Sequence, residues 1–163
     1  MKLIEIAAVG KNYELGKNND LIWHLKGDMQ FFRQTTKGQI VLMGRKTYES
    51  LPHLLPGRHH IVISRSDPFV EPEVEVFSTI DAFMKAYKEK DVDVYVIGGA
   101  QIYAQMLPYA DELLLTHIQD AEDADVYFPM FDSSLYEKTV LAEDEENDVA
   151  YEIVKYTKQK MAL

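Results

Sequence analysis

Short apolar runs recur along the chain and alternate with segments in which apolar residues repeat at helical spacing. The runs at 3–9, 39–43, 60–64, 74–77, 93–97 and 112–118 are mostly continuous in apolar residues, which is typical of parallel strands covered on both faces. Segments 26–36, 45–51, 79–90 and 99–107 lie between them and have the periodicity of helices. The pattern predicts an α/β fold with a central, mostly parallel sheet flanked by helices.

The last third of the chain has a different pattern. Residues 135–143 and 150–158 are strand-like and are joined by the acidic segment DEEND, which predicts a C-terminal antiparallel hairpin added at the sheet edge. The sequence shows no repeats, no low-complexity tract and no Gly/Ser linker. A chain of 163 residues has the length of one ordinary domain, and we expect residues 1–163 to form a single domain.

Composition narrows the class of protein. Hydrophobic residues make up 47% of the chain, yet no apolar run approaches the roughly 20 residues that span a bilayer. The N-terminal apolar segment contains Glu5, so it is interpreted as a strand rather than a secretory signal. Cysteine is absent, which excludes disulfides, thiolate metal sites and thiol nucleophiles. We expect a cytoplasmic protein without a metal and without a membrane partner.

The charge distribution points to a small anionic ligand. The net charge of −10 argues against nucleic acid as a partner, because binding to phosphate backbones needs a basic surface. Residues 1–65 nevertheless contain ten Lys and Arg against five Asp and Glu. Either these cations are solvated surface charge, or they form a site for an anion.

One carboxylate occupies a position where an apolar residue is expected. The apolar side of the first predicted helix carries Leu25, Met29 and Phe32, and Asp28 lies on the same side. A carboxylate facing the core costs free energy unless a partner binds it. Asp28 is either a helix cap near the N-terminus or a functional group in an apolar cleft. Trp23, the single tryptophan, either packs in the core or forms a wall of that cleft.

Two segments place cations where strands meet helices or loops. In VLMGRKTYES, Arg45 and Lys46 fall in the first turn of a predicted helix, where the helix dipole disfavours cations. An anion bound between them and the backbone N–H groups explains the arrangement; solvated charge is the alternative. In IVISR, a strand delivers Ser64 and Arg65 to its carboxyl end. Together these residues suit a phosphate monoester, such as the 2′-phosphate that distinguishes NADP from NAD.

Two glycine-containing turns complete the candidate chemistry. VYVIGGAQIYAQML contains a strand, Gly98 and Gly99, and then a helix. Adjacent glycines let the backbone approach a pyrophosphate closely, although a tight strand–helix turn is the alternative. In LLPGRHH, a Pro–Gly turn precedes Arg58, which is either a ligand for a carboxylate or an exposed loop cation.

In order and spacing, these segments resemble bacterial dihydrofolate reductase. The resemblance rests on IAAVGKNYELGKNNDLIWHLKGDMQFFRQTT, VLMGRKTYESL, LPGRHHIVISR, VIGGAQIY, LTHI and DADVYFP, and it covers essentially the whole chain. It implies the fold outlined above and the NADPH-dependent reduction of 7,8-dihydrofolate to tetrahydrofolate. The implied partners are dihydrofolate and antifolate inhibitors, the implied cofactor is NADPH, and a monomer is expected.

The resemblance also implies a role for each matching residue. Asp28 would bind the 2-amino group and N3 of the pterin, Thr116 would hydrogen-bond that carboxylate, and Trp23 would order a nearby water. Arg58 would bind the α-carboxylate of the glutamate tail. Leu21 would belong to a mobile loop over the nicotinamide. The Gly98–Gly99 peptide bond is expected to be cis.

The remaining implied contacts fall into two sets. The other substrate-binding positions are apolar: Ile6, Ala8, Met29, Phe32, Leu55 and Ile97. The cofactor-binding positions come from several separate segments: Ala8, Leu15, Gly16, Leu21, Gly44, Arg45, Lys46, Thr47, Ser64, Arg65, Ile97, Gly98, Gly99, Ala100, Gln101, Ile102 and Tyr103.

Two positions depart from the family's pattern. Ile22 stands where the mobile loop usually has proline, which leaves the backbone less restricted. Lys26 and Gly27 replace the more usual proline-containing start of the helix. The expected reaction transfers a hydride from nicotinamide C4 to pterin C6, and a water admitted when Leu21 shifts protonates N5. Asp28 would orient the ring and favour its protonated form electrostatically.

Two other functions fit parts of the pattern. A pyrimidine reductase of riboflavin synthesis shares this fold and cofactor but lacks the helix with Trp23, Asp28 and Phe32 in this form. A non-catalytic nucleotide-binding module would not need Asp28, Trp23 and Thr116 together. The sequence therefore favours the reductase that acts on dihydrofolate.

Overall fold

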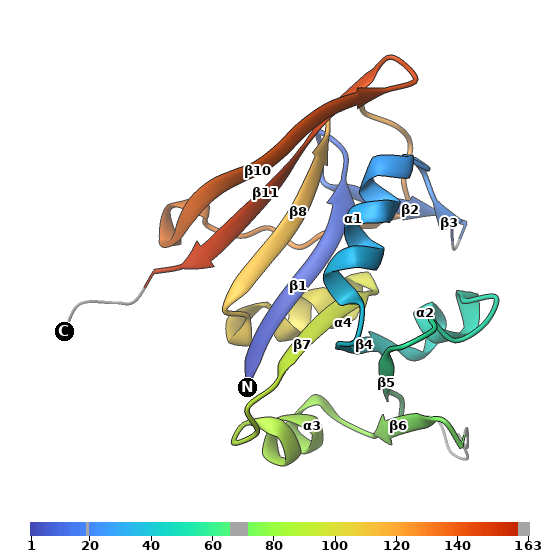
Figure 1. Cartoon of the computed structure of the whole chain (residues 1–163), viewed down its shortest axis with the longest axis vertical. Coiled ribbons are helices and arrows are strands. Elements are labelled where there is room, and N and C mark those ends of the chain that lie inside the picture. The colour runs from blue at the N-terminus through green and yellow to red at the C-terminus, as the bar shows by residue number, and fades with distance from the viewer. Residues whose placement is uncertain (19, 66–71, 160–163) are drawn as a thin grey trace.

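A mostly parallel β-sheet with helices on both faces forms the centre of the molecule (Figure 1). The computed structural model describes residues 1–18, 20–65 and 72–159. Within these residues, the main sheet has the strand order β10-β11-β8-β1-β7-β4-β5-β6. Its strands are β1 (Lys2–Val9), β4 (Ile40–Gly44), β5 (His59–Ile63), β6 (Val74–Phe77), β7 (Asp93–Gly98), β8 (Glu112–Ile118), β10 (Tyr136–Glu146) and β11 (Val149–Lys158). This architecture confirms the predicted fold class.

The central strand β1 explains why the sheet is covered on both sides. It pairs in parallel with β7 and with β8, and its side chains alternate between two apolar layers. Leu3 and Val9 belong to the large core under α3 (Ile80–Tyr87) and α4 (Ala100–Met106). Ile4 and Ile6 pack on the opposite face against residues of α1 (Lys26–Thr36). Both faces are apolar, so the strand reads as a continuous apolar run.

The helices lie close to their predicted positions. They are α1 (Lys26–Thr36), α2 (Arg45–Ser50), α3 (Ile80–Tyr87) and α4 (Ala100–Met106), with short 3₁₀ helices at Leu107–Tyr109 and Ser133–Leu135. Helix α3 is shorter than the predicted segment 79–90. It begins after Thr79, whose hydroxyl accepts a 3.0 Å hydrogen bond from the N–H of Ala82, and the residues after Tyr87 form a turn.

The C-terminal hairpin is longer than predicted and occupies the sheet edge as expected. Strand β11 pairs antiparallel with both β8 and β10. The turn consists of Asn147 and Asp148, with φ of 54° and 64°, a conformation typical of two-residue hairpin turns. Consequently Glu146 still pairs with Val149, and much of DEEND is strand rather than loop.

A small second sheet was not predicted from the sequence. It has the order β3-β2-β9, formed by β3 (Asp20–Leu21), β2 (Glu14–Lys17) and β9 (Val126–Tyr127). Strands this short show no clear alternation of apolar and polar residues. The Oδ2 atom of Asp125 accepts a 2.9 Å hydrogen bond from the N–H of Asn18, so the loop after β8 holds the turn that follows β2. Among the described residues, no helix is long and apolar enough to cross a bilayer.

Candidate functional site

A carboxylate and a hydroxyl meet where helix α1 crosses the carboxyl end of strand β8. The Oγ1 atom of Thr116 donates a 2.6 Å hydrogen bond to Oδ1 of Asp28. Thr116 is buried and Asp28 is half-buried. No side chain caps α1 from its N-cap residue Leu25, and the Asp28 carboxylate is directed to the sheet. The structure therefore supports a functional carboxylate over a local helix cap.

The sheet register explains how these two residues come together. Thr116 pairs with Ala8 of β1 on one side and with Ile153 of β11 on the other. All three positions lie near the end of the sheet where α1 begins. Ligands of open parallel sheets bind at the carboxyl ends of the strands. The Asp28–Thr116 pair thus lies at the edge where a ligand site is expected.

Burial and the hydrogen bond act in opposite directions on Asp28. Burial raises the pKa of the Asp28 carboxyl above its ordinary value, and the hydrogen bond from Thr116 lowers it in part. Burial has the larger effect because little water reaches the carboxylate to stabilise its charge. A carboxyl group with a raised pKa in an apolar site is typical of functional positions.

Apolar side chains form the floor beside the carboxylate. Ile6 packs in a cluster with Phe32 and Ile97, and Ile97 also contacts a neighbouring cluster that includes Leu55. Four of the six predicted apolar positions therefore form a continuous surface from α1 across the sheet to the segment before β5, whereas Ala8 packs in a separate cluster with Leu25 and Ile118. Met29 lies apart from these clusters, with 42% of its surface exposed.

Trp23 has a hydrogen-bond partner that the sequence did not indicate. Its indole N–H donates a 3.0 Å hydrogen bond to Oδ2 of Asp120, in the loop after β8. This hydrogen bond is the main reason that the pKa of Asp120 is lowered. Trp23 itself is half-buried and packs against the cluster that contains Leu25 and Ile118. The indole N–H is thus directed to Asp120.

Arg58 is held in place by the C-terminal end of α1. Its guanidinium donates 2.6 Å hydrogen bonds to the carbonyls of Arg33 and Pro56, and a 3.2 Å bond to Oγ1 of Thr36. Carbonyl groups at a helix C-terminus attract cations. The side chain is half-buried and fixed, which differs from an exposed loop cation and suits a cation that receives a ligand carboxylate.

The predicted cofactor residues gather at the carboxyl ends of β4, β5 and β7. Gly44 pairs with Ile63, so the start of α2 lies beside Ser64. The Gly98–Gly99 peptide is cis, as expected, and Gly98 has a φ of 143°. A Cβ atom on Gly98 would lie 3.1 Å from Oγ1 of Thr47. The glycine turn and α2 therefore come together through a contact that a larger residue would obstruct.

Buried polar atoms at this edge fit a phosphorylated ligand. The buried hydroxyl of Ser64 has no hydrogen-bond partner within the described residues, and a buried donor normally has one. Arg65, the next residue in the sequence, is exposed. Lys46 is also exposed and lies in the first turn of α2, after Gly44, which pairs with Ile63. Arg45 forms an ion pair with Glu49, at 3.0 Å between Nε and Oε1. This donor set is suited to a phosphate monoester.

Three other predicted cofactor positions lie in or beside the small sheet. Leu15 packs against the large core, Gly16 pairs with Leu21, and Leu21 is 54% exposed. These three residues lie in the segment that follows the carboxyl end of β1. In helix α4, the side chain of Tyr103 is buried, and its hydroxyl donates a 2.7 Å hydrogen bond to the carbonyl of Ile6.

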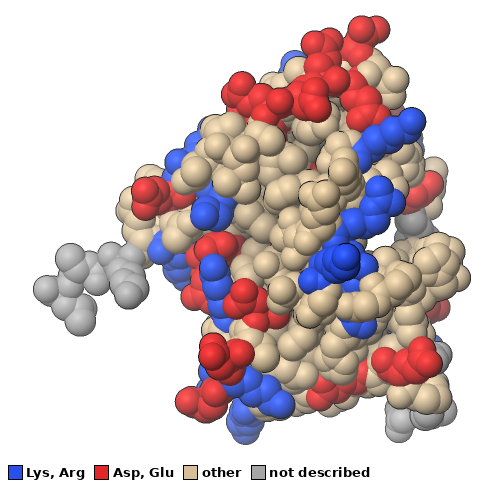
Figure 2. Space-filling model, viewed as in Figure 1, with Lys and Arg blue, Asp and Glu red and all other residues tan. Residues whose placement is uncertain are grey.

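Acidic and basic side chains gather on different parts of the surface. In Figure 2, acidic side chains gather at the top of the view over the hairpin tip, while Lys and Arg side chains lie lower, over the region of α1 and α2. The cationic first part of the chain is thus displayed near the predicted site. Elsewhere in this view Lys and Arg side chains lie among Asp and Glu side chains, so the region of α1 and α2 is the part of this face where an anion is most favoured.

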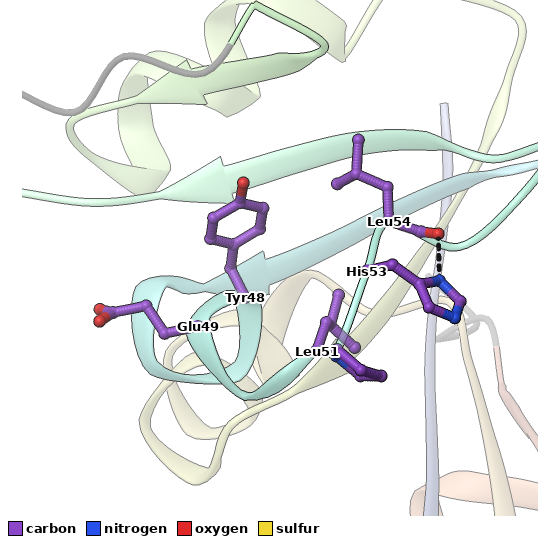
Figure 3. A pocket seen from close by; sticks show the side chains of 6 residues that line it. Tyr48, Glu49, Leu51, His53 and Leu54 are labelled. Carbon is purple, nitrogen blue, oxygen red and sulfur yellow. Dashed lines mark hydrogen bonds between the residues drawn. The ribbon is translucent and has the colours of Figure 1, made fainter.

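A surface pocket of about 290 Å³ lies nearby but is separate from this site (Figure 3). It opens between α2 and the segment before β5, and its residues are Tyr48, Glu49, Leu51, Pro52, His53 and Leu54. The Nδ1 atom of His53 lies 2.9 Å from the carbonyl oxygen of Leu54. None of the pocket's residues belongs to the Asp28–Thr116 pair or to the glycine turn.

Comparisons with known proteins agree with this fold. A model of the dihydrofolate reductase family matches residues 2–158. A dihydrofolate reductase type 3 from Salmonella typhimurium is 37% identical over 158 residues, covering 95% of this chain and 97% of that protein. A dihydrofolate reductase from Bacillus subtilis is also 37% identical over 158 residues, with coverage of 94% and 93%. The solved dihydrofolate reductase from Enterococcus faecalis, complexed with NADP(H) and RAB-propyl, has a TM-score of 0.87 and 26% identity, with coverage of 98% and 97%.

Proposed function

The chain belongs to the dihydrofolate reductase family, and from this premise we propose that Asp28 is the group that binds and activates its substrate. The protein is an enzyme that reduces dihydrofolate with NADPH. The observation that carries the proposal is the 2.6 Å hydrogen bond between Thr116 and Asp28. It places one half-buried carboxylate, with a defined orientation, at the edge of an apolar surface.

The substrate is proposed to lie with its pterin ring between Asp28 and the apolar floor. Asp28 would accept hydrogen bonds from the 2-amino group and N3, because a carboxylate with one oxygen bound to Thr116 still has acceptor capacity on the other. Phe32, Ile6 and Ile97 would contact the ring faces. Arg58, held by the end of α1, would pair with the α-carboxylate at the far end of the substrate.

The residues on the cofactor side fit NADPH. The hydroxyl of Ser64, which has no hydrogen-bond partner in the described part of the chain, would bind the 2′-phosphate together with the cations Arg65 and Lys46. The narrow turn at Gly98 and Gly99 would admit the pyrophosphate against the backbone. When bound, the dinucleotide supplies the hydride that reduces the substrate. The protein's contribution is to hold the two rings together and to limit access of water between them.

Protonation of N5 is proposed to use water rather than a side chain. The hydroxyl of Tyr103 is engaged with the Ile6 carbonyl and the indole N–H of Trp23 with Asp120, and Asp28 is directed to Thr116. Leu21, exposed on the two-residue strand β3, is placed to admit water when it shifts. The negative charge of the Asp28 carboxylate would stabilise the protonated ring, and the proton itself would come from water rather than from Asp28.

Several broader properties belong to the same proposal. We expect residues 1–163 to act as one domain, which is supported by a family match over residues 2–158, and we expect the protein to be a monomer. The ligands would be small molecules, namely dihydrofolate, NADPH and antifolates. A cytoplasmic location is supported by the bacterial relatives and by the absence of cysteine.

A turnover assay separates this function from its nearest alternative. Purified protein is mixed with NADPH and either dihydrofolate or a ribosylaminopyrimidine, and absorbance at 340 nm is followed. The expected result is a rapid loss of absorbance when dihydrofolate is the substrate and no such loss with the ribosylaminopyrimidine. Equal or faster oxidation of NADPH with the ribosylaminopyrimidine would contradict the proposed substrate.

A further inference from the structure

The N-terminus of helix α1 is capped by a residue from the opposite end of the chain. The carboxylate of Glu146 accepts hydrogen bonds from the N–H of Lys26 at Oε1, 3.0 Å, and from the N–H of Gly27 at Oε2, 3.4 Å. These are the first two residues of the helix, and such N–H groups have no acceptor within the helix itself. Glu146 therefore performs the capping role that Leu25 does not perform.

The hairpin turn fixes where this carboxylate lies. Glu146 is the last residue of β10, directly before the turn at Asn147 and Asp148, and it pairs with Val149. Figure 1 shows the hairpin tip next to the upper end of α1, which is its N-terminal end. Glu146 is partly buried, unlike the exposed Glu143 and Glu145 on the same strand. A carboxylate in this place also interacts favourably with the positive end of the helix dipole.

A second contact from the same hairpin supports the first helical turn. A Cβ atom on Gly27 would clash with the hydroxyl of Tyr151 and come within 3.2 Å of its Cζ atom. Tyr151 is buried on β11 and packs with Leu25. A glycine at position 27 thus allows the helix backbone to approach Tyr151 closely. The ring of Tyr151 supports the turn that precedes Asp28.

Strand β11 also supports the other half of the Asp28 pair. Ile153 of β11 lies opposite Thr116 of β8 in the antiparallel register, two residues after Tyr151. One hairpin therefore contacts the turn that carries the carboxylate and the strand that carries its hydrogen-bond donor. A shift of the hairpin would alter the geometry of both partners.

We propose that Glu146 is a positioning residue, which holds the first turn of α1 against Tyr151 so that Asp28 meets Thr116 in the productive orientation. The proposal deepens the proposed function, since it rests on the role of Asp28 in binding the pterin. Glu146 contacts neither substrate nor cofactor in this account. Its effect is transmitted through two backbone N–H groups and one helical turn.

The test compares Glu146→Ala with Glu146→Gln and with the matched control Glu143→Ala. For each protein, the KM for dihydrofolate, the Kd for NADPH and the single-turnover rate of NADPH oxidation are measured. Because small displacements of a positioned group cost up to about a hundredfold, we expect Glu146→Ala to raise the KM for dihydrofolate and lower the rate, each by roughly tenfold. NADPH affinity should stay unchanged. Glu146→Gln, which retains an acceptor oxygen, should recover much of the loss, and Glu143→Ala should behave as wild type.

Amide hydrogen exchange gives a readout at the cap itself. Exchange at both Lys26 and Gly27 should accelerate in Glu146→Ala. In Glu146→Gln the single amide oxygen can still accept the shorter bond from Lys26, so exchange should accelerate mainly at Gly27. Should Glu146→Ala fold poorly, Glu146→Gln carries the test through its partial defect: faster exchange at Gly27 together with a partial rise in the KM for dihydrofolate is expected, and wild-type exchange at both N–H groups with a wild-type KM would overturn the positioning role.

Two outcomes would overturn the inference. One is a Glu146→Ala protein with wild-type KM and rate within about twofold, and the other is an equal loss of NADPH affinity, which would indicate general loosening of the fold. Asp28→Asn assayed in parallel separates this failure from failure of the proposed function. If Asp28→Asn is impaired while Glu146→Ala is not, only the positioning role is wrong; if Asp28→Asn is fully active, the proposed function is wrong.

Discussion

Thr116 donates a 2.6 Å hydrogen bond to Asp28 across 88 residues of sequence, and it joins strand β8 to the first turn of helix α1. This bond selects one orientation of the carboxylate and leaves its other oxygen for a ligand. It also opposes the rise in the pKa of Asp28 that burial causes. This single hydrogen bond therefore affects both the orientation and the pKa of Asp28.

Removing the donor should change both the ionisation and the affinity of the site. In Thr116→Val, the pKa of Asp28 should rise further, because burial then acts without the opposing hydrogen bond. A lost hydrogen bond to a charged group should raise the KM for dihydrofolate by about tenfold. The measurements are a carboxyl ¹³C NMR titration of Asp28 and steady-state kinetics. Thr116→Ser should retain wild-type behaviour, and an unchanged or lower pKa in Thr116→Val would refute the role of the bond.

The bond between Trp23 and Asp120 should couple the loop before α1 to the loop after β8. Asp120→Ala should reduce kcat several-fold because Trp23 loses the partner that fixes its ring. In a Trp23→Phe background, which has no indole N–H, the same Asp120→Ala change should have little further effect. A double-mutant cycle on kcat measures this coupling. Strictly additive effects would show that the two residues act independently.

The alternation of elements was predictable because local patterns determine it. Strands β1 and β8 are nearly continuous apolar runs, and α1 has apolar residues on one side with Asp28 among them. Such periodicities depend on a few neighbouring residues and are visible in any single sequence. The position of Asp28 was therefore anomalous in the sequence itself, although its partner Thr116 was assigned only by resemblance to the family.

The supporting contacts were not predictable because they join distant segments. Glu146 caps a helix that begins 120 residues earlier, and Asp120 bonds an indole 97 residues away. Neither acidic residue differs in local pattern from the solvated acids around it. The pair Asn147–Asp148 could have located the hairpin turn, since both residue types tolerate positive φ, and this would have placed Glu146 in a strand.

Glu5 gives the protein a characteristic dependence of stability on pH. Its carboxyl group is fully buried, neither oxygen has a hydrogen-bond partner in the described part of the chain, and burial raises its pKa to about 9. The folded state therefore holds a proton that the unfolded state releases near pH 4.5. Stability contributed by the neutral carboxyl is complete below about pH 4.5 and is lost progressively as pH rises towards 9.

Replacing this carboxyl should remove the pH dependence. Between pH 5 and pH 9, wild type should lose a few kcal/mol of unfolding free energy relative to Glu5→Gln, because only wild type has a carboxyl group to ionise at this position. Urea denaturation at several pH values measures it, and the control Glu143→Gln, at an exposed position, should show no such trend. A constant difference across this range would show that Glu5 does not remain protonated in the folded protein.

Arg65 should determine the choice between dinucleotides. The residue follows Ser64 at the carboxyl end of β5 and is exposed, where its guanidinium can pair with a 2′-phosphate. Arg65→Ala should weaken NADPH binding by about tenfold or more, because a charge-assisted contact is lost, with NADH binding nearly unchanged. Fluorescence titration with each dinucleotide compares them. Equal losses for NADPH and NADH would exclude recognition of the 2′-phosphate.

The most direct test of the central claim is the single-turnover rate of Asp28→Asn at neutral pH, with NADPH affinity measured on the same sample. Asparagine preserves the shape of the side chain and can still accept the bond from Thr116, but it carries no charge. The single-turnover rate should fall by about a hundredfold or more, while the Kd for NADPH should stay nearly unchanged. A variant that reduces dihydrofolate at the wild-type rate would contradict the assignment of Asp28 as the carboxylate that binds and activates the substrate.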